Sequence, residues 1–313
     1  MVSFEDGEGQ RLGLLLNDRG ELVDVAAIAR QLNIAAPRHF GDLLVVLTSG
    51  QNSLADVLYS LESDGSTDRI PEAVLPIDAV RLRAPITPGA QILCAGGNYR
   101  SHLQEMQAMA VPSSVLWFTK ATTAVIGPND AIILPRHAPD MVDYEGELAV
   151  VIGRPCYRVS EDEALSFVGG YTLLNDVSAR DWVKEALAAE DPQEVRASWG
   201  RNLLGKQFPT FCPLGPVVVT SDELQDPGDL HLTTRVNGAV VQDSSTADLI
   251  VGVPALVSYF SQFVALAPGD IISTGSPPGV GVARTPPIFL APGDRVEIEV
   301  APIGVLSNPV EAE

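Results

Sequence analysis

Positive charge is scarce in this sequence. Its 313 residues include 20 Lys+Arg against 40 Asp+Glu, so the formal net charge is −20, and lysine occurs only as Lys120, Lys184 and Lys206. A nucleic-acid binder needs basic side chains to neutralise phosphates, and a protein held by charge to an anionic membrane needs a polybasic segment. The composition therefore predicts that neither nucleic acid nor a membrane is a partner.

Cysteine and long apolar runs are scarce as well. Cys94, Cys156 and Cys212 form no CxxC pair and each lies in an apolar stretch, which predicts three buried thiols in a reducing compartment. No uncharged apolar run approaches the roughly 18 residues that a membrane span needs. The first ten residues are polar and acidic, unlike a signal peptide. We therefore expect a cytoplasmic location.

What the chain does have is apolar sequence in short pieces. Hydrophobic residues make up 46% and charged residues 19%, which is typical of a globular protein. From about residue 86 the pieces are β-branched and end at Gly, Pro or Asp, as strands do. Asn237-Gly238 and the three Pro-Gly-Asp tripeptides predict turns between them. Many strands with few helices predict a β-rich core, rolled or closed as a barrel.

The first 85 residues form a separate small unit in this interpretation. Residues 11–16 and 21–32 are strand-like, whereas apolar residues recur every three or four positions from Leu54 to Leu61, as in a helix. We predict two domains, a small N-terminal one over residues 1–85 and a larger one over residues 86–313.

Two acidic residues stand at the entry of the apolar run 148–153. Glu145 and Glu147 are two positions apart, so in a strand their side chains point to the same face. Two carboxylates at a buried strand are costly unless a positive charge neutralises them, and a divalent cation that prefers oxygen ligands does so. The alternative is a solvated strand end with two ordinary surface acids. Asp176 follows another apolar strand and is either a third oxygen ligand or a cap for a helix that starts at Ser178.

One of the four histidines has an acid three residues later. If the segment after Asn98 is helical, His102 and Glu105 are neighbours on one face of the helix. A carboxylate beside an imidazole orients the ring and strengthens it as a general base. The alternative is a surface ion pair.

Two lysines and one loop also stand out. Lys120 and Lys206 lie in apolar stretches, where a lysine either pairs with an anion or extends its ammonium group to water. The Gly/Pro-rich loop 274–281 follows a strand, and its N–H groups together with the Thr274 hydroxyl could cradle a carboxylate. The loop lacks the GK[ST] ending of a phosphate-binding P-loop, and the chain has no GxGxxG or GxSxG motif.

Taken together and in this order, the segments over roughly residues 90 to 310 resemble the fumarylacetoacetate hydrolase family. The matching pieces are Asn98-Tyr99 with His102 and Glu105, Phe118-Thr119-Lys120, Asp143-Tyr144-Glu145-Gly146-Glu147-Leu148, Asn175-Asp176-Val177-Ser178-Ala179-Arg180-Asp181, Gly205-Lys206, Pro213-Leu214-Gly215-Pro216, Val236-Asn237-Gly238, Pro268-Gly269-Asp270 and Thr274-Gly275-Ser276-Pro277-Pro278-Gly279-Val280-Gly281.

The resemblance implies an α+β, β-rich fold: a mixed β-roll or barrel catalytic domain, a small N-terminal α/β domain, and usually a homodimer. It implies a Mg²⁺ site, with Mn²⁺ or Ca²⁺ as other candidate ions, formed by Glu145, Glu147 and Asp176. Family substrates are mostly small anionic β-diketo or α-keto acids, many of them from the breakdown of aromatic compounds.

We therefore predict a metal-dependent hydrolase that cleaves a C–C bond in a β-diketo acid of the acylpyruvate or fumarylpyruvate type, giving pyruvate and a carboxylic acid. His102, oriented by Glu105, would activate the attacking water, and Lys206 would stabilise the developing negative charge. An oxaloacetate decarboxylase, a 2-hydroxyhepta-2,4-diene-1,7-dioate isomerase and a non-catalytic metal-binding protein are the alternatives. The residues predicted to bind substrate are Asn98, Tyr99, Arg100, Lys120, Thr274 and Gly275.

The segment 101–115 is predicted to form or border a lid over this site. Met106, Met109, Val111 and Trp117 would then line a pocket for the acyl group. The alternative is that these side chains take part in ordinary packing.

Overall fold

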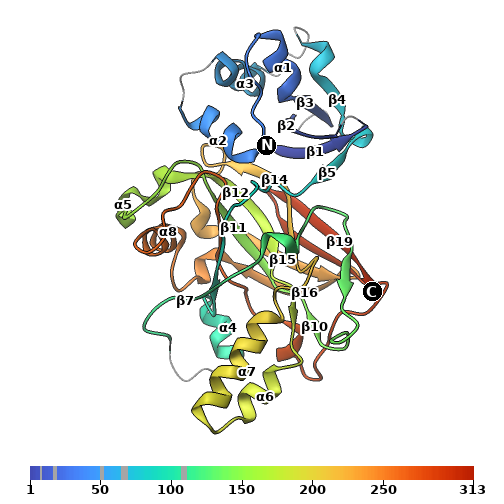
Figure 1. Cartoon of the computed structure of the whole chain (residues 1–313), viewed down its shortest axis with the longest axis vertical. Coiled ribbons are helices and arrows are strands. Elements are labelled where there is room, and N and C mark those ends of the chain that lie inside the picture. Colours follow the sequence, from blue (N-terminus) through green and yellow to red (C-terminus); the bar gives the residue numbers. More distant parts are fainter. Residues whose placement is uncertain (8, 17–19, 50–52, 65–69, 107–110) are drawn as a thin grey trace.

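The computed structural model describes residues 1–7, 9–16, 20–49, 53–64, 70–106 and 111–313 (Figure 1). The first part of the chain builds an antiparallel five-stranded sheet in the order β4-β3-β2-β1-β5. Three helices pack on one face, and Phe4 and Leu22 on the other face pack with Val217 of the next sheet. The elements are β1 (Val2–Asp6), β2 (Gly9–Leu16), β3 (Glu21–Asp24), α1 (Val25–Gln31), α2 (Phe40–Ser49), α3 (Ser53–Asp64), β4 (Val74–Pro76) and β5 (Arg81–Arg83).

The strand-like interpretation of residues 21–32 is wrong for most of that segment. The strand stops at Asp24, whose carboxylate accepts a hydrogen bond from the Ala26 N–H at 2.9 Å and so caps α1. The alanine-rich sequence that follows favours a helix. The helix predicted over residues 54–61 is confirmed as part of α3. The domain boundary near residue 85 stays a prediction.

The body of the molecule contains a mixed seven-stranded sheet in the order β7-β6-β17-β11-β12-β14-β8. Its central strands β17, β11, β12 and β14 are antiparallel neighbours, whereas β6 runs parallel to β17 and β8 parallel to β14. The strands are β6 (Ile92–Gly96), β7 (Leu116–Thr119), β8 (Val125–Ile126), β11 (Gly146–Ile152), β12 (Val168–Asn175), β14 (Cys212–Thr220) and β17 (Ile271–Ser273).

A second large sheet, of five strands in the order β16-β15-β18-β19-β9, packs against the first. The main hydrophobic cluster lies between them and joins Leu148 of β11, Leu232 of β15 and Ile298 of β18. The strands of this sheet are β9 (Ile132–Leu134), β15 (His231–Val236), β16 (Ala239–Ser245), β18 (Arg295–Val300) and β19 (Gly304–Ala312). The chain is therefore α+β and strand-rich with a curled sheet, as predicted.

Short elements complete the described part of the chain. Helices α6 and α7 lie at the end of the molecule opposite to the N-terminal sheet (Figure 1). Remaining elements are α4 (Arg100–Glu105), the two-stranded ladder of β10 (Val142–Asp143) with β13 (Ser178–Ala179), α5 (Glu161–Ala164), α6 (Val183–Ala188), α7 (Pro192–Leu204), α8 (Val253–Ser261) and the 3-10 helices η1 (Pro71–Ala73), η2 (Ile77–Ala79), η3 (Thr122–Ala124), η4 (Leu165–Phe167), η5 (Pro227–Asp229), η6 (Thr246–Asp248) and η7 (Gly281–Ala283).

Two further predictions are tested by the structure. All three cysteines are free and buried, as expected. No helix in the described ranges has the length and apolar character to cross a membrane.

A close approach of two glycines supports the pairing of β11 with β12. A Cβ added to Gly153 would lie 2.6 Å from the Gly169 Cα, where only backbone could move away. We expect Gly153→Ala to lower the free energy of unfolding by about 1–3 kcal/mol, because overpacking a tight contact forces the backbone apart. Urea unfolding measures this change. Gly200→Ala is the matched control, because Gly200 lies in α7 with nothing within 4 Å of its added Cβ. Equal stability of the two variants would contradict the prediction.

Candidate active site

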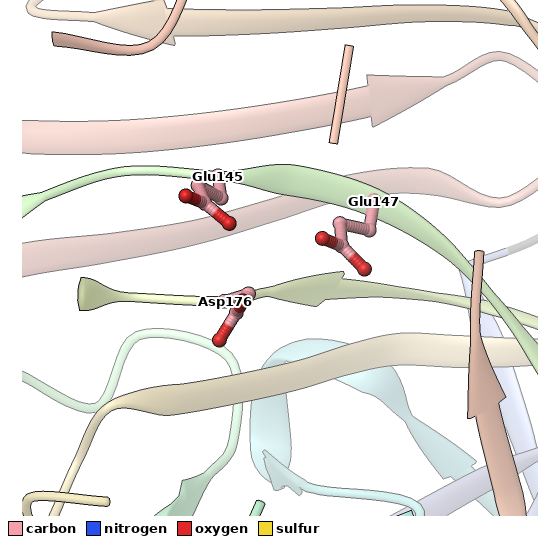
Figure 2. A group of neighbouring side chains, drawn as sticks. All are labelled: Glu145, Glu147 and Asp176. Carbon is pink, nitrogen blue, oxygen red and sulfur yellow. The ribbon is translucent and has the colours of Figure 1, made fainter. Parts of the chain in front are cut away.

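Three buried carboxylates meet where strand β11 begins and strand β12 ends. In the antiparallel register Gly146 pairs with Asn175 and Glu147 with Leu174, and the Asp176 N–H donates to the Glu145 carbonyl at 2.8 Å, so the three acids lie at the same end of this strand pair. Figure 2 shows the three side chains close together, and one oxygen of each lies within 4.8 Å of the others. All three side chains are buried. The prediction that Glu145 and Glu147 share a face is confirmed, and the solvated strand end is not what the structure contains.

Two lysines pair with carboxylates of this acidic cluster. The Lys120 ammonium lies 2.6 Å from Asp176 Oδ1, and the Lys206 ammonium contacts the other oxygen of Asp176 and lies 3.2 Å from Glu145 Oε2. Both lysines are buried, at 3% and 6% exposure, so neither extends to water. Lys206 also donates to the Ser178 hydroxyl at 2.8 Å.

The helix start predicted at Ser178 is wrong. Ser178 lies in β13, which pairs with β10, and the next helix begins at Val183. The Asp176 carboxylate, which was the predicted cap, pairs with Lys120 and Lys206, and the Ser178 hydroxyl accepts from Lys206 and donates to the Asp176 carbonyl at 2.8 Å. Asp176 accordingly faces the lysines instead of capping a helix.

Arg180 is a third cation in the cluster, which the sequence did not single out. Its Nε donates to Asp143 Oδ2 at 3.1 Å and its Nη2 contacts Glu145 Oε1. Burial alone would raise the pKa of Glu145, but the charges of Arg180 and Lys206 outweigh burial and hold that pKa well below the usual carboxyl range. Glu145 is therefore ionised in this structure.

Lys206 shows the complementary effect. Burial would lower the pKa of its ammonium group, but the neighbouring Asp176 and Glu145 carboxylates raise it above the usual lysine range. Lys206 is therefore a fixed positive charge beside the carboxylates and not a proton acceptor.

Glu147 differs from the other two acids because no cationic side chain in the described residues pairs with it. It accepts hydrogen bonds from the Ser273 hydroxyl and from the Gly275 N–H, the latter at 3.1 Å. Burial first, and then the charges of Asp176 and Glu145, raise the pKa of Glu147 well above its usual value. Ionised Glu147 would add a negative charge that the lysines and Arg180 do not neutralise, so without a bound cation this carboxyl favours its protonated form.

These residues fit a divalent cation. Hard ions such as Mg²⁺ and Mn²⁺ prefer carboxylate oxygens, and a few carboxylates are enough because such ions keep open positions for water or substrate. The three oxygens are close enough to bind one ion together, and Glu147 is the acid that still lacks a counter-charge. The donor set therefore suits a divalent metal.

The contact predicted between His102 and Glu105 is formed, and their role as an acid–base pair stays a prediction. Helix α4 brings His102 Nδ1 to 3.0 Å from Glu105 Oε2, and Glu105 Oε1 accepts from the Gly279 N–H at 2.9 Å. Because an ionised carboxylate only accepts hydrogen bonds, this contact places the ring proton on Nδ1. The Nε2 atom is then left with a lone pair that can accept a proton.

The loop that follows β17 was predicted to bind a substrate carboxylate. In this structure its N–H groups bind carboxylates of the protein itself. Its N–H groups donate at Gly275 to Glu147, at Gly279 to Glu105, and at Gly281 and Val282 to Asp143. One loop therefore connects a candidate metal ligand, the acid–base pair and the acid that holds Arg180.

The other residues predicted to bind substrate make local contacts in this structure. The Asn98 amide bonds to the backbone of Val251 and Thr274, and the Arg100 guanidinium donates to the Asp248 and Leu249 carbonyls. The Tyr99 side chain is buried. The Thr274 hydroxyl donates to the Leu148 carbonyl at 3.0 Å, and Gly275 binds Glu147. Their roles toward a substrate stay predictions.

The predicted lid is only partly within the described residues. Residues 107–110, with Met109, lie outside them. Val111 lines a pocket of about 340 Å³ together with Gly97, Asn98 and Tyr259. Met106 is half-exposed, and Trp117 packs edge-on against Phe260 with ring centroids 6.2 Å apart. The lid itself stays a prediction.

Residues 91–311 match the model of the fumarylacetoacetate (FAA) hydrolase C-terminal domain. The chain belongs to the fumarylacetoacetate hydrolase family. It is 39% identical over 312 residues to a mitochondrial oxaloacetate tautomerase of Xenopus laevis, covering 99% of this chain and 89% of the relative. A mitochondrial oxaloacetate tautomerase of Bos taurus is 40% identical over 306 residues, covering 96% of this chain and 88% of the relative.

Solved structures of this family agree with the fold. A fumarylacetoacetate hydrolase from Exiguobacterium antarcticum superposes with a TM-score of 0.79 at 32% identity, over 100% of this chain and 99% of that one. A maleylpyruvate hydrolase from Sphingobium sp. SYK-6, solved with manganese(II) and pyruvate, has a TM-score of 0.74 at 27% identity, over 100% and 99% of the two chains. Named members of the family are tautomerases, isomerases and hydrolases. The chain is accordingly an enzyme, and the non-catalytic alternative is not supported.

Proposed function

We propose that this enzyme moves a proton on a small keto acid of the oxaloacetate type, interconverting its enol and keto forms with the help of a divalent cation. The observation that carries the proposal is the His102–Glu105 pair, anchored on the same loop that binds Glu147. Relatives named as oxaloacetate tautomerases, matched over nearly the whole chain, support this choice of substrate.

The residues of the site have different roles in this reaction. Glu145, Glu147 and Asp176 would hold the cation, which would draw electron density from the keto oxygen and so make the neighbouring C–H more acidic. His102 Nε2 takes the proton from C3 as the C2=C3 double bond forms, and the protonated imidazole then gives that same proton to the C2 oxygen to form the enol. The reverse sequence returns the keto form, so no atom is gained or lost.

Two neighbours of the reacting group support this division. Glu105 keeps the imidazole in the tautomer whose Nε2 is free, through the 3.0 Å contact with Nδ1. Lys206, a fixed positive charge, stabilises the negative charge that develops on the C2 oxygen while the proton is on His102.

Hydrolysis of an acylpyruvate is the second candidate. The same Nε2 atom can take a proton from water, which then attacks the distal carbonyl and releases pyruvate. The observation that favours this candidate is the structural likeness to the maleylpyruvate hydrolase solved with manganese(II) and pyruvate. Decarboxylation of oxaloacetate needs neither the water nor His102, so it draws no support from the acid–base pair.

One assay separates these reactions. Purified enzyme with Mg²⁺ or Mn²⁺ is mixed with enol-oxaloacetate, and the ultraviolet absorbance of the enol is followed together with total oxaloacetate and pyruvate. We expect faster loss of enol, constant total oxaloacetate and no pyruvate, and we expect EDTA to abolish the acceleration. Pyruvate from oxaloacetate would indicate decarboxylation instead. Pyruvate from acetylpyruvate or fumarylpyruvate, with no effect on the enol, would establish the hydrolase.

Several narrower expectations stay predictions beside this proposal. They are Mg²⁺ as the ion in use, a homodimer, a role in the breakdown of aromatic compounds, and a cytoplasmic location. The frog and cattle relatives are named as mitochondrial proteins. Analytical ultracentrifugation tests the homodimer, and activity with each ion tests the metal.

A further inference from the structure

We infer that Tyr144 and Arg284 are positioning residues that set the geometry of the His102–Glu105 pair through the backbone of Gly279. The inference rests on the proposed function, in which His102 transfers the proton. Neither residue contacts His102, and both would act through two intervening groups. They are therefore not catalytic residues themselves.

The contacts form a continuous series. Tyr144 Oη donates to the Gly279 carbonyl at 3.1 Å, and Arg284 Nε donates to the same carbonyl at 3.2 Å and to Tyr144 Oη at 3.1 Å. On the other side of that glycine, its N–H donates to Glu105 Oε1 at 2.9 Å. Glu105 Oε2 in turn holds His102 Nδ1 at 3.0 Å. The orientation of one glycine residue therefore determines where the Glu105 carboxylate lies.

The backbone at Gly279 has little freedom to change this orientation. Its φ of +103° is in the region that favours glycine, and an added Cβ would lie 2.0 Å from the Val241 carbonyl oxygen. Arg284 Nη2 donates to that same oxygen at 2.6 Å. One guanidinium group thus joins the Gly279 carbonyl, the Tyr144 hydroxyl and the strand that Gly279 packs against.

Glu105 needs such an anchor. It is the last residue of the short helix α4, and its side chain is 23% exposed, so helix packing alone does not fix the carboxylate. A displacement of about 1 Å in a group that aligns a reaction can cost about 100-fold in rate. The Gly279 N–H supplies the second point of attachment, beside His102 itself.

Tyr144 can be tested apart from the metal ligands, although it precedes Glu145. Asp143 and Glu145 both contact Arg180, so they project to one side of the chain. Tyr144 lies instead in a hydrophobic cluster with Val142 and Phe211. Tyr144→Phe removes one hydroxyl group from this cluster and leaves every carboxylate in place.

The experiment compares Tyr144→Phe and Arg284→Lys with the parent enzyme, using kcat, KM and the Kd for Mn²⁺ measured by calorimetry. Lysine keeps the charge of Arg284 but not its fork of donors. We expect kcat to fall about 10-fold in each variant, with KM and Kd unchanged within about 2-fold, because only the alignment of the proton-transfer group is altered. The matched controls are Tyr171→Phe, in the buried strand β12, and Arg235→Lys, which pairs with Glu299 away from this loop; both should keep the parent kcat.

A double variant distinguishes positioning from general damage. In the His102→Ala background, Tyr144→Phe should not lower the residual rate further, because the group that it positions is already gone. A further 10-fold loss there, or a loss of Mn²⁺ binding in Tyr144→Phe, would overturn the inference. Unchanged kcat in both single variants, with His102→Ala inactive, would overturn the inference and leave the proposed function intact. An active His102→Ala enzyme would overturn both.

Discussion

Glu147→Gln should abolish the binding of a divalent cation and leave the metal-free protein at least as stable as the parent. Glu147 is buried with no cationic partner in the described residues, and its surroundings raise its pKa well above the usual value. A neutral amide at this position avoids both the cost of burying an ionised carboxylate and the cost of protonating Glu147 above its usual pKa. It also removes one of three ligands, which should weaken metal binding by more than the roughly 10-fold to 100-fold that loss of an outer-shell partner costs.

The matched variant Asp176→Asn should lose the metal too, but with the opposite effect on stability. Asp176 is the carboxylate that Lys120 and Lys206 share, so its loss leaves two buried ammonium groups without their main partner. Breaking a buried pair in this way typically costs about 3–5 kcal/mol. The metal-free protein should therefore unfold at lower denaturant concentration than either the parent or Glu147→Gln.

Calorimetric titration with Mn²⁺ and urea unfolding with and without the ion test this pair of variants. At an ion concentration 100 times its Kd, the parent should gain about 2.7 kcal/mol from binding, and neither variant should gain anything. Ion-dependent stabilisation of Glu147→Gln equal to that of the parent would show that Glu147 is not a ligand. Equal destabilisation of the two metal-free variants would contradict the assignment of charges in the cluster.

His102→Ala should lower kcat by about 100-fold to 10,000-fold, the usual contribution of a general acid–base group, while the Kd for Mn²⁺ stays at the parent value. The reason is that His102 lies in α4 and pairs with Glu105, whereas the candidate metal ligands lie in and beside β11 and β12. Steady-state kinetics on enol-oxaloacetate and on an acylpyruvate measure the loss for both candidate reactions.

Two further variants test whether the loss of activity in His102→Ala is specific to the imidazole of His102. Glu105→Gln should lose less activity than His102→Ala, because the imidazole remains and only its orientation is altered. His231→Ala is the control, since His231 also pairs with an acid, Asp243 at 2.8 Å, but both of these side chains are exposed. Loss of Mn²⁺ binding in His102→Ala, or equal loss of activity in His231→Ala, would contradict the role given to His102.

The sequence predicted those parts of the site that depend on local spacing. The strand β11 is buried along its whole length, as its continuous apolar run indicated, so the positions of Glu145 and Glu147 relative to each other followed from strand geometry. The helical spacing of His102 and Glu105 was also enough to predict their contact. In both cases the interacting residues are within three positions of each other.

Contacts between distant segments were not predictable in this way. Arg180 bonds to residues 35 and 37 positions away, and nothing in its local sequence distinguishes it from a surface arginine. The sequence feature that could have indicated a buried cation is the alternation of Asp143 and Glu145. Two acids on one face of a buried strand need a positive charge opposite them. For the loop after β17, the sequence predicted that N–H groups would bind carboxylates, but which carboxylates they bind is decided by tertiary packing.

The loop after β17 makes its contacts through main-chain N–H groups, and this restricts which residues can replace one another there. Proline has no N–H, so it is incompatible with positions 275, 279, 281 and 282, each of which donates to a carboxylate. At Pro277 and Pro278, where no donor is needed, proline is present and stiffens the chain between two donors. Exchange for proline at any of the four donor positions would therefore remove a main-chain hydrogen bond to a carboxylate, whereas Pro277 and Pro278 give up no such bond.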